Sequence, residues 1–239
     1  MLGHLTQNLE ADKSATFYFV DGLYDVPPYP DLEYECAPPN LVYFQYTSTS
    51  PSGSSFQSQI DFLGLRDAKD PHDQMRRLWR EYGPQDHHNV TSVTLEYMQN
   101  IIEDEGPFHG VIGASEGGCA AATVLLDHLQ RSRDVDDAAT MMCGVFFIST
   151  PALQADGLGY MLSDNAETRI SVPTCHIYSD SDPIAWMAQC LANTCQEDGR
   201  EIILHDKGHV IPHTKEMMVD VANFIRRVKA AAAAKPSAV

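Results

Sequence analysis

A serine flanked by glycines near the middle of the chain is the residue best suited to chemistry. The segment VIGASEGG, residues 111–118, carries the pattern G-x-S-x-G, with Gly113 and Gly117 two positions on either side of Ser115. When a serine sits on a strained turn between a strand and a helix, small residues at these two positions let the backbones cross. The pattern is common by chance, but here an apolar run ends at it and a helical pattern begins after it. We therefore interpret Ser115 as a nucleophile rather than as one residue of a glycine-rich turn.

A serine nucleophile also needs a base and an acid, because its hydroxyl is weakly reactive at neutral pH. The base must lie within hydrogen-bond reach, and a carboxylate must hold the base in the right tautomer. In proteins with this kind of turn the chain order is serine, acid, histidine. Downstream of Ser115 an apolar run ends in SDSDP, residues 179–183, so Asp180 and Asp182 compete for the role of the acid. We favour Asp182, because the proline after it ends the strand and can turn this carboxylate inward.

The base is expected in the segment HDKGH, residues 205–209, which follows the next apolar run. His205 stays close to that run, whereas His209 follows Gly208 on a loop able to swing over the serine, so we favour His209. Together with His213, these histidines have a spacing that would align three metal ligands on a helix. A glycine and a proline within the segment argue against a helix there, and we expect neither a metal nor another cofactor.

The elements that must position these residues alternate along the chain. Apolar runs rich in aromatic and β-branched residues predict strands at residues 16–20, 110–114, 144–149, 174–178 and 201–204. Most of the runs are continuous, as strands buried on both faces require. Helical patterns lie between and after them, at residues 90–105, 117–131, 184–196 and 214–229. This alternation predicts an α/β fold with a mostly parallel sheet flanked by helices, and places the serine, the acid and the histidine at carboxyl ends of strands.

The length of 239 residues fits one domain, which we expect over residues 1–229. Residues 46–86 interrupt the alternation as an insertion, and their first part is too rich in serine and glycine to pack as a core element. Within the insertion a helix is expected at residues 70–82. The insertion fits a lid over a pocket and an inert surface excursion equally well. Residues 230–239 are expected to form a disordered tail.

The composition argues against several kinds of partner. With 33 acidic and 16 basic residues the formal net charge is -17, which repels phosphate backbones and anionic membrane surfaces. We therefore expect no nucleic-acid partner and no membrane partner. The six cysteines lack the short, even spacings of a disulfide scaffold or a metal knuckle, so we expect reduced, buried thiols. The chain starts without a secretory signal and has no run of about 18 apolar residues, which indicates a soluble, cytoplasmic protein.

Segments spread over most of the chain resemble the fungal serine hydrolase family, and especially its members from polyketide gene clusters. The matching segments are FYFVDGLYDVPPYP, IIEDEGPFHGVIGASEGGCAAA, GVFFIST, VPTCHIYSDSDPI and HDKGHVIP. The resemblance implies a metal-independent α/β-hydrolase that uses Ser115, Asp182 and His209 on an ester or thioester. It also implies release or trimming of a polyketide-like acyl chain, which can be held on an acyl carrier protein. Glu116 is similar to the version from polyketide clusters, and we expect its side chain to be exposed.

The chain departs from the resembling family at its start. Relatives begin with an apolar strand and a His-Gly loop, and this loop supplies one of two backbone N–H donors to the oxyanion. Here MLGHLTQNL resembles the helix that normally follows the loop, so we expect a fold without the usual first strand, through loss or truncation. The N–H of Glu116 would remain as one donor. If the runs at 16–20 and 110–114 pair directly, the turn with Gly22 and Leu23 would supply the other; otherwise we expect a poorly formed site.

Three functions are compatible with these residues. The first is a serine esterase or thioesterase that forms an acyl-enzyme on Ser115 and hydrolyses it with a water that His209 activates. The second is cyclisation, dehydration or isomerisation of a polyketide-like substrate, with His209 or Asp182 as acid-base groups, and the missing oxyanion loop motivates it. The third is a non-catalytic binding protein. We expect the first, with a small-molecule acyl ester or thioester as the partner, and leave a homodimer open.

Overall fold

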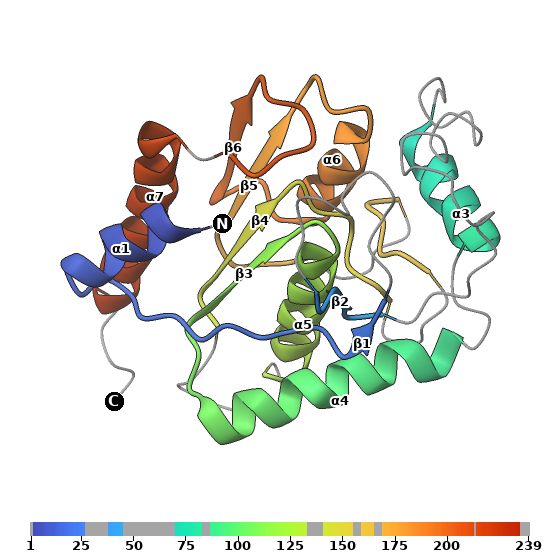
Figure 1. Cartoon of the computed structure of the whole chain (residues 1–239), viewed down its shortest axis with the longest axis horizontal. Coiled ribbons are helices and arrows are strands. Elements are labelled where there is room, and N and C mark those ends of the chain that lie inside the picture. The colour runs from blue at the N-terminus through green and yellow to red at the C-terminus, as the bar shows by residue number, and fades with distance from the viewer. Residues whose placement is uncertain are drawn as a thin grey trace.

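The strands expected around the nucleophile form one parallel sheet. The structure is a computed structural model and describes residues 2–26, 38–44, 70–82, 87–132, 141–154, 159–164, 169–212 and 214–234. Its larger sheet has the strand order β3-β4-β5-β6 (Figure 1), with bounds β3 Gly110–Ala114, β4 Cys143–Phe147, β5 Thr174–Ser179 and β6 Arg200–His205. The strands predicted at these places, and the α/β class, are confirmed.

Helices pack on both faces of this sheet. On one face lie α1 (Gly3–Ala11) and α7 (Lys215–Ala233), side by side on the left of Figure 1. On the other face lie α4 (His87–Glu105) and α5 (Glu116–Arg131), while α6 (Ala185–Thr194) packs against β5. The helix expected within the insertion is present as α3 (Pro71–Tyr82) and packs against α6. The predicted layering of helix, sheet and helix is therefore present.

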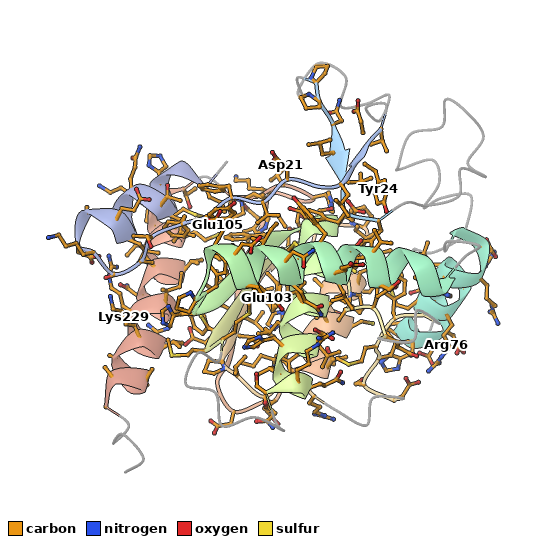
Figure 2. All side chains as sticks on the ribbon, turned by 90° about the horizontal axis from the view of Figure 1, so that it is seen from below. Asp21, Tyr24, Arg76, Glu103, Glu105 and Lys229 are labelled. Carbon is orange, nitrogen blue, oxygen red and sulfur yellow. The ribbon has the colours of Figure 1, made fainter. Side chains whose placement is uncertain are left out.

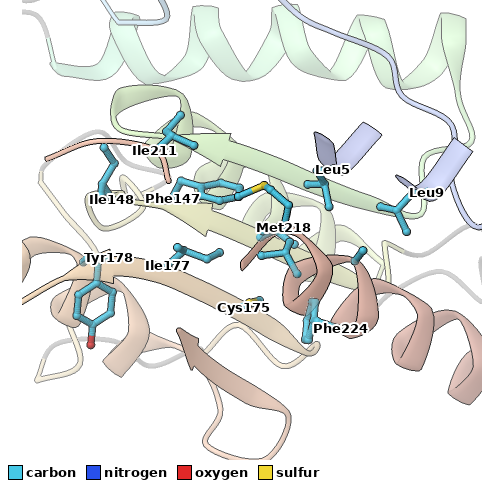
Figure 3. Packing of buried hydrophobic residues seen from close by; sticks show 14 of the residues in the cluster. Leu5, Leu9, Phe147, Ile148, Cys175, Ile177, Tyr178, Ile211, Met218 and Phe224 are labelled. Carbon is cyan, nitrogen blue, oxygen red and sulfur yellow. The ribbon is translucent and has the colours of Figure 1, made fainter. Parts of the chain in front are cut away.

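Strand β4 lies at the centre of the core because its side chains are buried on both faces. Val145 and Phe147 belong to the apolar cluster with α1 and α7, where Leu5 and Phe224 are also buried (Figure 3). Phe146, between them in the sequence, belongs to the cluster on the side of α5. Successive residues of a strand point to opposite faces, so the run CGVFF serves both clusters. Each such side chain contributes about 1.5–3 kcal/mol when fully buried, and β4 thereby fixes its neighbours β3 and β5.

The strand expected at residues 16–20 is wrong. Residues 15–22 join no sheet, and β3 is an edge strand among the described residues. Side-chain packing anchors the segment instead: Phe17 contacts the core cluster, and the ring centroid of Tyr18 lies 5.7 Å from that of Phe108. The aromatic run predicted a strand because apolar periodicity is taken to report burial. Here Phe17 packs on the core while Tyr18 and Phe19 are exposed, so the run corresponds neither to a buried segment nor to a hydrogen-bond ladder.

The chain after this segment passes beside α4 and makes a small second sheet. The Tyr97 hydroxyl of α4 donates to the carbonyl oxygen of Asp21 at 3.1 Å, and Figure 2 shows Asp21 and Tyr24 alongside this helix. Two short strands, β1 (Tyr24–Asp25) and β2 (Leu41–Val42), then pair antiparallel. This pairing carries the residues after β2 back to the body of the molecule.

Several other expectations concern the ends of the elements. Helix α7 continues to Ala233, so the disordered tail predicted from residue 230 is wrong for its first residues. The expected roles of residues 46–69, 83–86 and 235–239 fall outside the described part of the chain.

Five cysteines of the described residues are free thiols, namely Cys119, Cys143, Cys175, Cys190 and Cys195. None of the described helices is long and apolar enough to span a membrane.

Candidate active site

Ser115 occupies a strained turn between β3 and α5. Its backbone has φ 51° and ψ -122°, a conformation that a residue with a side chain rarely adopts. Its N–H still donates to the carbonyl oxygen of Phe147 at 2.9 Å, which continues the pairing of β3 with β4 up to the turn. The residue is exposed. The strain therefore holds the Ser115 hydroxyl out at the carboxyl edge of the sheet.

The glycines around Ser115 are required by the close approach of strand and helix. A Cβ on Gly113 would collide with the carbonyl oxygen of Gly117 and lie 2.6 Å from the Cα of Gly118. A Cβ on Gly118 would lie 2.5 Å from the Cβ of Ser149, in the segment after β4. Side chains at these positions would push α5 away from the sheet. The steric cause expected from the sequence is thus present at Gly113, whereas a Cβ on Gly117 would meet only the ring of Tyr43 at 3.3 Å.

Asp182 and His209 form a hydrogen-bonded pair at the same edge. His209 Nδ1 donates to Asp182 Oδ2 at 2.8 Å, and the other carboxylate oxygen of Asp182 accepts the N–H of Ile184 at 3.0 Å. The Asp182 side chain is only 2% exposed, whereas that of His209 is 32% exposed. Asp180, the alternative acid, is exposed. A buried carboxylate therefore holds the imidazole through Nδ1, the nitrogen by which an acid orients a histidine base.

The loop after β6 carries His209 across the sheet edge. Gly208 has φ 69°, and its N–H donates to the hydroxyl of Ser179 at the end of β5, at 3.2 Å. Further along, Ile211 is buried in one cluster with Ile148, at the end of β4 (Figure 3). The loop is thus anchored over the ends of β5 and β4, toward the strand that ends at Ser115.

The alternative base, His205, is placed differently from His209. His205 is the last residue of β6, and its Nδ1 accepts the backbone N–H of Lys207 at 3.2 Å. Burial lowers the pKa of His205, which favours its neutral form. His213 lies outside the described residues. Of the residues predicted for the acid and the base, the structure joins Asp182 to His209.

Glu116 does not have the exposed side chain expected from the sequence. Its two carboxylate oxygens accept the backbone N–H groups of Tyr43 at 3.3 Å and of Phe44 at 3.1 Å. Burial raises the pKa of Glu116 to about 7, while these two hydrogen bonds act in the opposite direction. Its partners lie more than 70 positions away in the sequence, so no local pattern could have indicated this contact.

The expected oxyanion donors are only partly accounted for. The N–H of Glu116 lies at the amino end of α5, directly after Ser115 and in a position suited to a developing negative charge. The proposed pairing of residues 16–20 with β3 is not formed. Gly22 instead lies against Val42, since a Cβ on Gly22 would approach the carbonyl carbon of Val42 to 2.5 Å. The condition under which Gly22 or Leu23 would supply the second donor is therefore not met, and the N–H of Glu116 is the expected donor that the structure places at Ser115.

A strained serine, a buried carboxylate and a histidine at one edge of a parallel sheet define a serine hydrolase of the α/β-hydrolase class. The chain belongs to the serine hydrolase (FSH1) family, whose family model matches residues 2–221. The family resemblance expected from the sequence is thereby confirmed.

Several relatives are similar to this chain at a moderate level of sequence identity. "Family of serine hydrolases 2" from Saccharomyces cerevisiae is 26% identical over 194 residues, which cover 79% of this chain and 86% of that protein. "Esterase FUS5" from Gibberella moniliformis is 28% identical over 61% of this chain and 58% of its own length. "Esterase FPY3" from Fusarium mangiferae is 26% identical over 59% of this chain and 66% of its own length. The chain thus spans less than two thirds of each of these two esterases.

Solved structures resemble the chain over part of its length. The Bacillus cereus carboxylesterase is 13% identical, with a TM-score of 0.38 over 58% of this chain and 59% of that chain. A fungal esterase from Rhizomucor miehei is 12% identical, with a TM-score of 0.41 over 59% of this chain and 60% of that chain. These scores are too low to carry an argument about the site.

Proposed function

We propose that the protein hydrolyses an ester or thioester of a polyketide-like acyl chain, with Ser115 as nucleophile, His209 as base and Asp182 as the residue that orients the base. One observation carries the proposal. The buried Asp182 holds Nδ1 of His209 at 2.8 Å, and both lie at the sheet edge where Ser115 has its strained conformation. A hydrogen bond at Nδ1 leaves Nε2 as the proton acceptor that a serine nucleophile requires.

The reaction proceeds in two steps through an acyl-enzyme. The Ser115 hydroxyl attacks the substrate carbonyl carbon while His209 Nε2 takes its proton, and the N–H of Glu116 stabilises the oxyanion. The intermediate collapses, the bond to the alcohol or thiol breaks, and His209 returns the proton to this leaving group. A water then attacks the acyl-enzyme, with His209 again accepting and returning a proton. The products are a carboxylic acid and free Ser115.

The substrate class is supported by the surroundings of the nucleophile and by the relatives. Phe44, Trp79 and Leu153 form a buried apolar cluster with Cys119, which lies in the first turn of α5. An apolar cluster next to the nucleophile turn favours a substrate with an apolar acyl group. FUS5 and FPY3 are named esterases and come from fungi. Delivery of the acyl chain by an acyl carrier protein, action in fungal secondary metabolism and a cytoplasmic location are parts of the same proposal.

Mass analysis of products tests the reaction class. The purified chain is incubated with p-nitrophenyl esters and with N-acetylcysteamine thioesters of acetyl, octanoyl and β-ketoacyl groups. Hydrolysis adds one water to each acyl chain, and Ser115→Ala should lower the rate by several powers of ten. A cyclised, dehydrated or isomerised product without a free acid would contradict hydrolysis. Full hydrolysis by Ser115→Ala would contradict the acyl-enzyme. Thioesters that stay intact while esters are cleaved would restrict the activity to an esterase.

A further inference from the structure

The carboxylate of Glu116 joins the nucleophile turn to residues 41–44. Through its two oxygens it accepts the N–H groups of Tyr43 and Phe44, and the ring of Tyr43 lies against Gly117, whose Cβ would be 3.3 Å from it. Glu116 is the first residue of α5, so the contact is made directly after the turn that carries Ser115. Residues 41–44 are therefore tied to the nucleophile by one side chain.

The same segment is held from its other side by neutral groups. The Tyr43 hydroxyl donates to the carbonyl oxygen of Val20 at 2.6 Å, and the Thr94 hydroxyl of α4 donates to the carbonyl oxygen of Tyr43 at 2.6 Å. Phe44 is 1% exposed and belongs to the apolar cluster with Trp79. Tyr43 and Phe44 thus form one side of the apolar cluster that includes Cys119 in the first turn of α5.

We propose that Glu116 is a positioning residue for acyl-chain recognition: its half-buried carboxylate holds residues 41–44 as a wall beside the turn that carries Ser115, and ionisation of this carboxylate favours release of the wall. This inference rests on the proposed function in one respect, namely that the ligand beside the wall is an acyl chain. The contact between Glu116 and the segment is a feature of the fold.

Three titratable groups of the described residues face Glu116 and are neutral around pH 7. They are the Tyr43 hydroxyl, the Cys119 thiol in α5 and the Tyr160 hydroxyl, and burial raises the pKa of each. Glu116 changes charge in this range, whereas these three groups do not. Its pKa is about 7 in place, against 4.5 when solvated, because burial disfavours the charged form. A proton consequently stabilises the closed wall, and the ratio of closed to open wall should fall on the order of 50-fold from pH 5 to pH 8.

Hydrogen exchange at the Tyr43 and Phe44 amides measures the ratio of closed to open wall directly. Exchange is followed in the full chain from pH 5 to pH 8 and divided by the intrinsic rate at each pH, with amides of β4 as an internal reference. In the native chain the protection should fall tens of fold across this range. In Glu116→Gln, which cannot ionise and offers one acceptor instead of two, the protection should not depend on pH. Protection that is constant in the native chain, or that falls equally in Glu116→Gln, would overturn the proposal.

A matched variant separates the carboxylate from a general loosening of the segment. Tyr43→Phe removes the hydrogen bond to Val20 and leaves Glu116 in place. In this variant the exchange protection of the amides at positions 43 and 44 should be lower at every pH but keep the pH dependence of the native chain. Loss of that dependence in Tyr43→Phe would also count against Glu116. The preference in kcat/KM for octanoyl over acetyl esters should fall several-fold from pH 6 to pH 8 in the native chain and stay level in Glu116→Gln. Failure of Ser115 to react would refute the hydrolase while leaving the exchange result intact.

Discussion

Replacing Asp182 with Asn removes the charge that orients His209 and keeps the shape of the side chain. In the native structure one carboxylate oxygen accepts the N–H of Ile184 and the other accepts Nδ1–H of His209. A backbone N–H can only donate, so it selects the oxygen of the new amide and turns the NH₂ group toward His209. The imidazole must then accept at Nδ1 and carry its proton on Nε2. In that tautomer it cannot take the proton of Ser115.

The size of the effect follows from these contacts. Turning the amide over would leave the Ile184 N–H facing a donor, at a cost of about 1–3 kcal/mol for a buried unsatisfied group. The unproductive tautomer is therefore favoured roughly 5- to 150-fold. The variant also lacks the negative charge that stabilises the imidazolium in the transition state, and charge-assisted hydrogen bonds are about twice as strong as neutral ones. Together these effects should lower kcat by about 10³ to 10⁴.

Steady-state hydrolysis of a p-nitrophenyl ester measures the loss, and thermal unfolding verifies that the variant is folded. Asp180→Asn is the matched control, because Asp180 lies two residues earlier in the same turn and is exposed. It should stay within about twofold of the native rate. A loss below tenfold for a folded Asp182→Asn, or a larger loss for Asp180→Asn, would refute the assignment of the acid.

The remaining predictions concern stability and metals. In urea titrations, the unfolding free energy of the native chain should fall by about 2 kcal/mol between pH 5 and pH 8, relative to that of Glu116→Gln. The reason is that the folded state raises the pKa of Glu116 to about 7. The stabilisation from the bound proton is complete below pH 4.5 and is lost as the pH rises through 7. Equal pH dependence of both proteins would contradict this. Gly113→Ala should destabilise the fold by about 1–3 kcal/mol in thermal unfolding, because the added Cβ collides with Gly117, and an unchanged melting temperature would count against so tight a crossing. Treatment with EDTA should leave hydrolysis unchanged, since the proposed mechanism uses no metal, whereas loss with recovery by zinc would support a histidine metal site.

The sheet could be predicted from the sequence because its strands are buried on both faces. A continuous apolar run such as CGVFF is typical of a central strand in a parallel sheet. The functional residues come directly after such runs in the sequence. Residues 16–20 show where this reasoning fails. The Phe17 side chain packs on the core, as it would in a strand. Whether the backbone pairs depends on which other segment lies beside it, and apolar periodicity carries no information about that second segment.

The candidate site was predictable to the extent that it follows local rules. Gly113 has a steric cause, and the proline after Asp182 favours this residue over Asp180 as the acid. The role of Glu116 could not be predicted in this way. Its carboxylate meets Tyr43 and Phe44 only because the chain between β2 and α4 returns to the nucleophile turn. Such a contact is decided by tertiary packing.

Labelling with a fluorophosphonate, followed by peptide mass analysis, tests the central claim most directly, because this reagent reacts only with a serine activated by a neighbouring base. The native chain should carry one adduct, on Ser115. The adduct should be absent in Ser115→Ala and should form far more slowly in Asp182→Asn, in proportion to its loss of kcat. An unlabelled native chain, or an adduct on another serine, would contradict the assignment of Ser115, His209 and Asp182 as a catalytic unit.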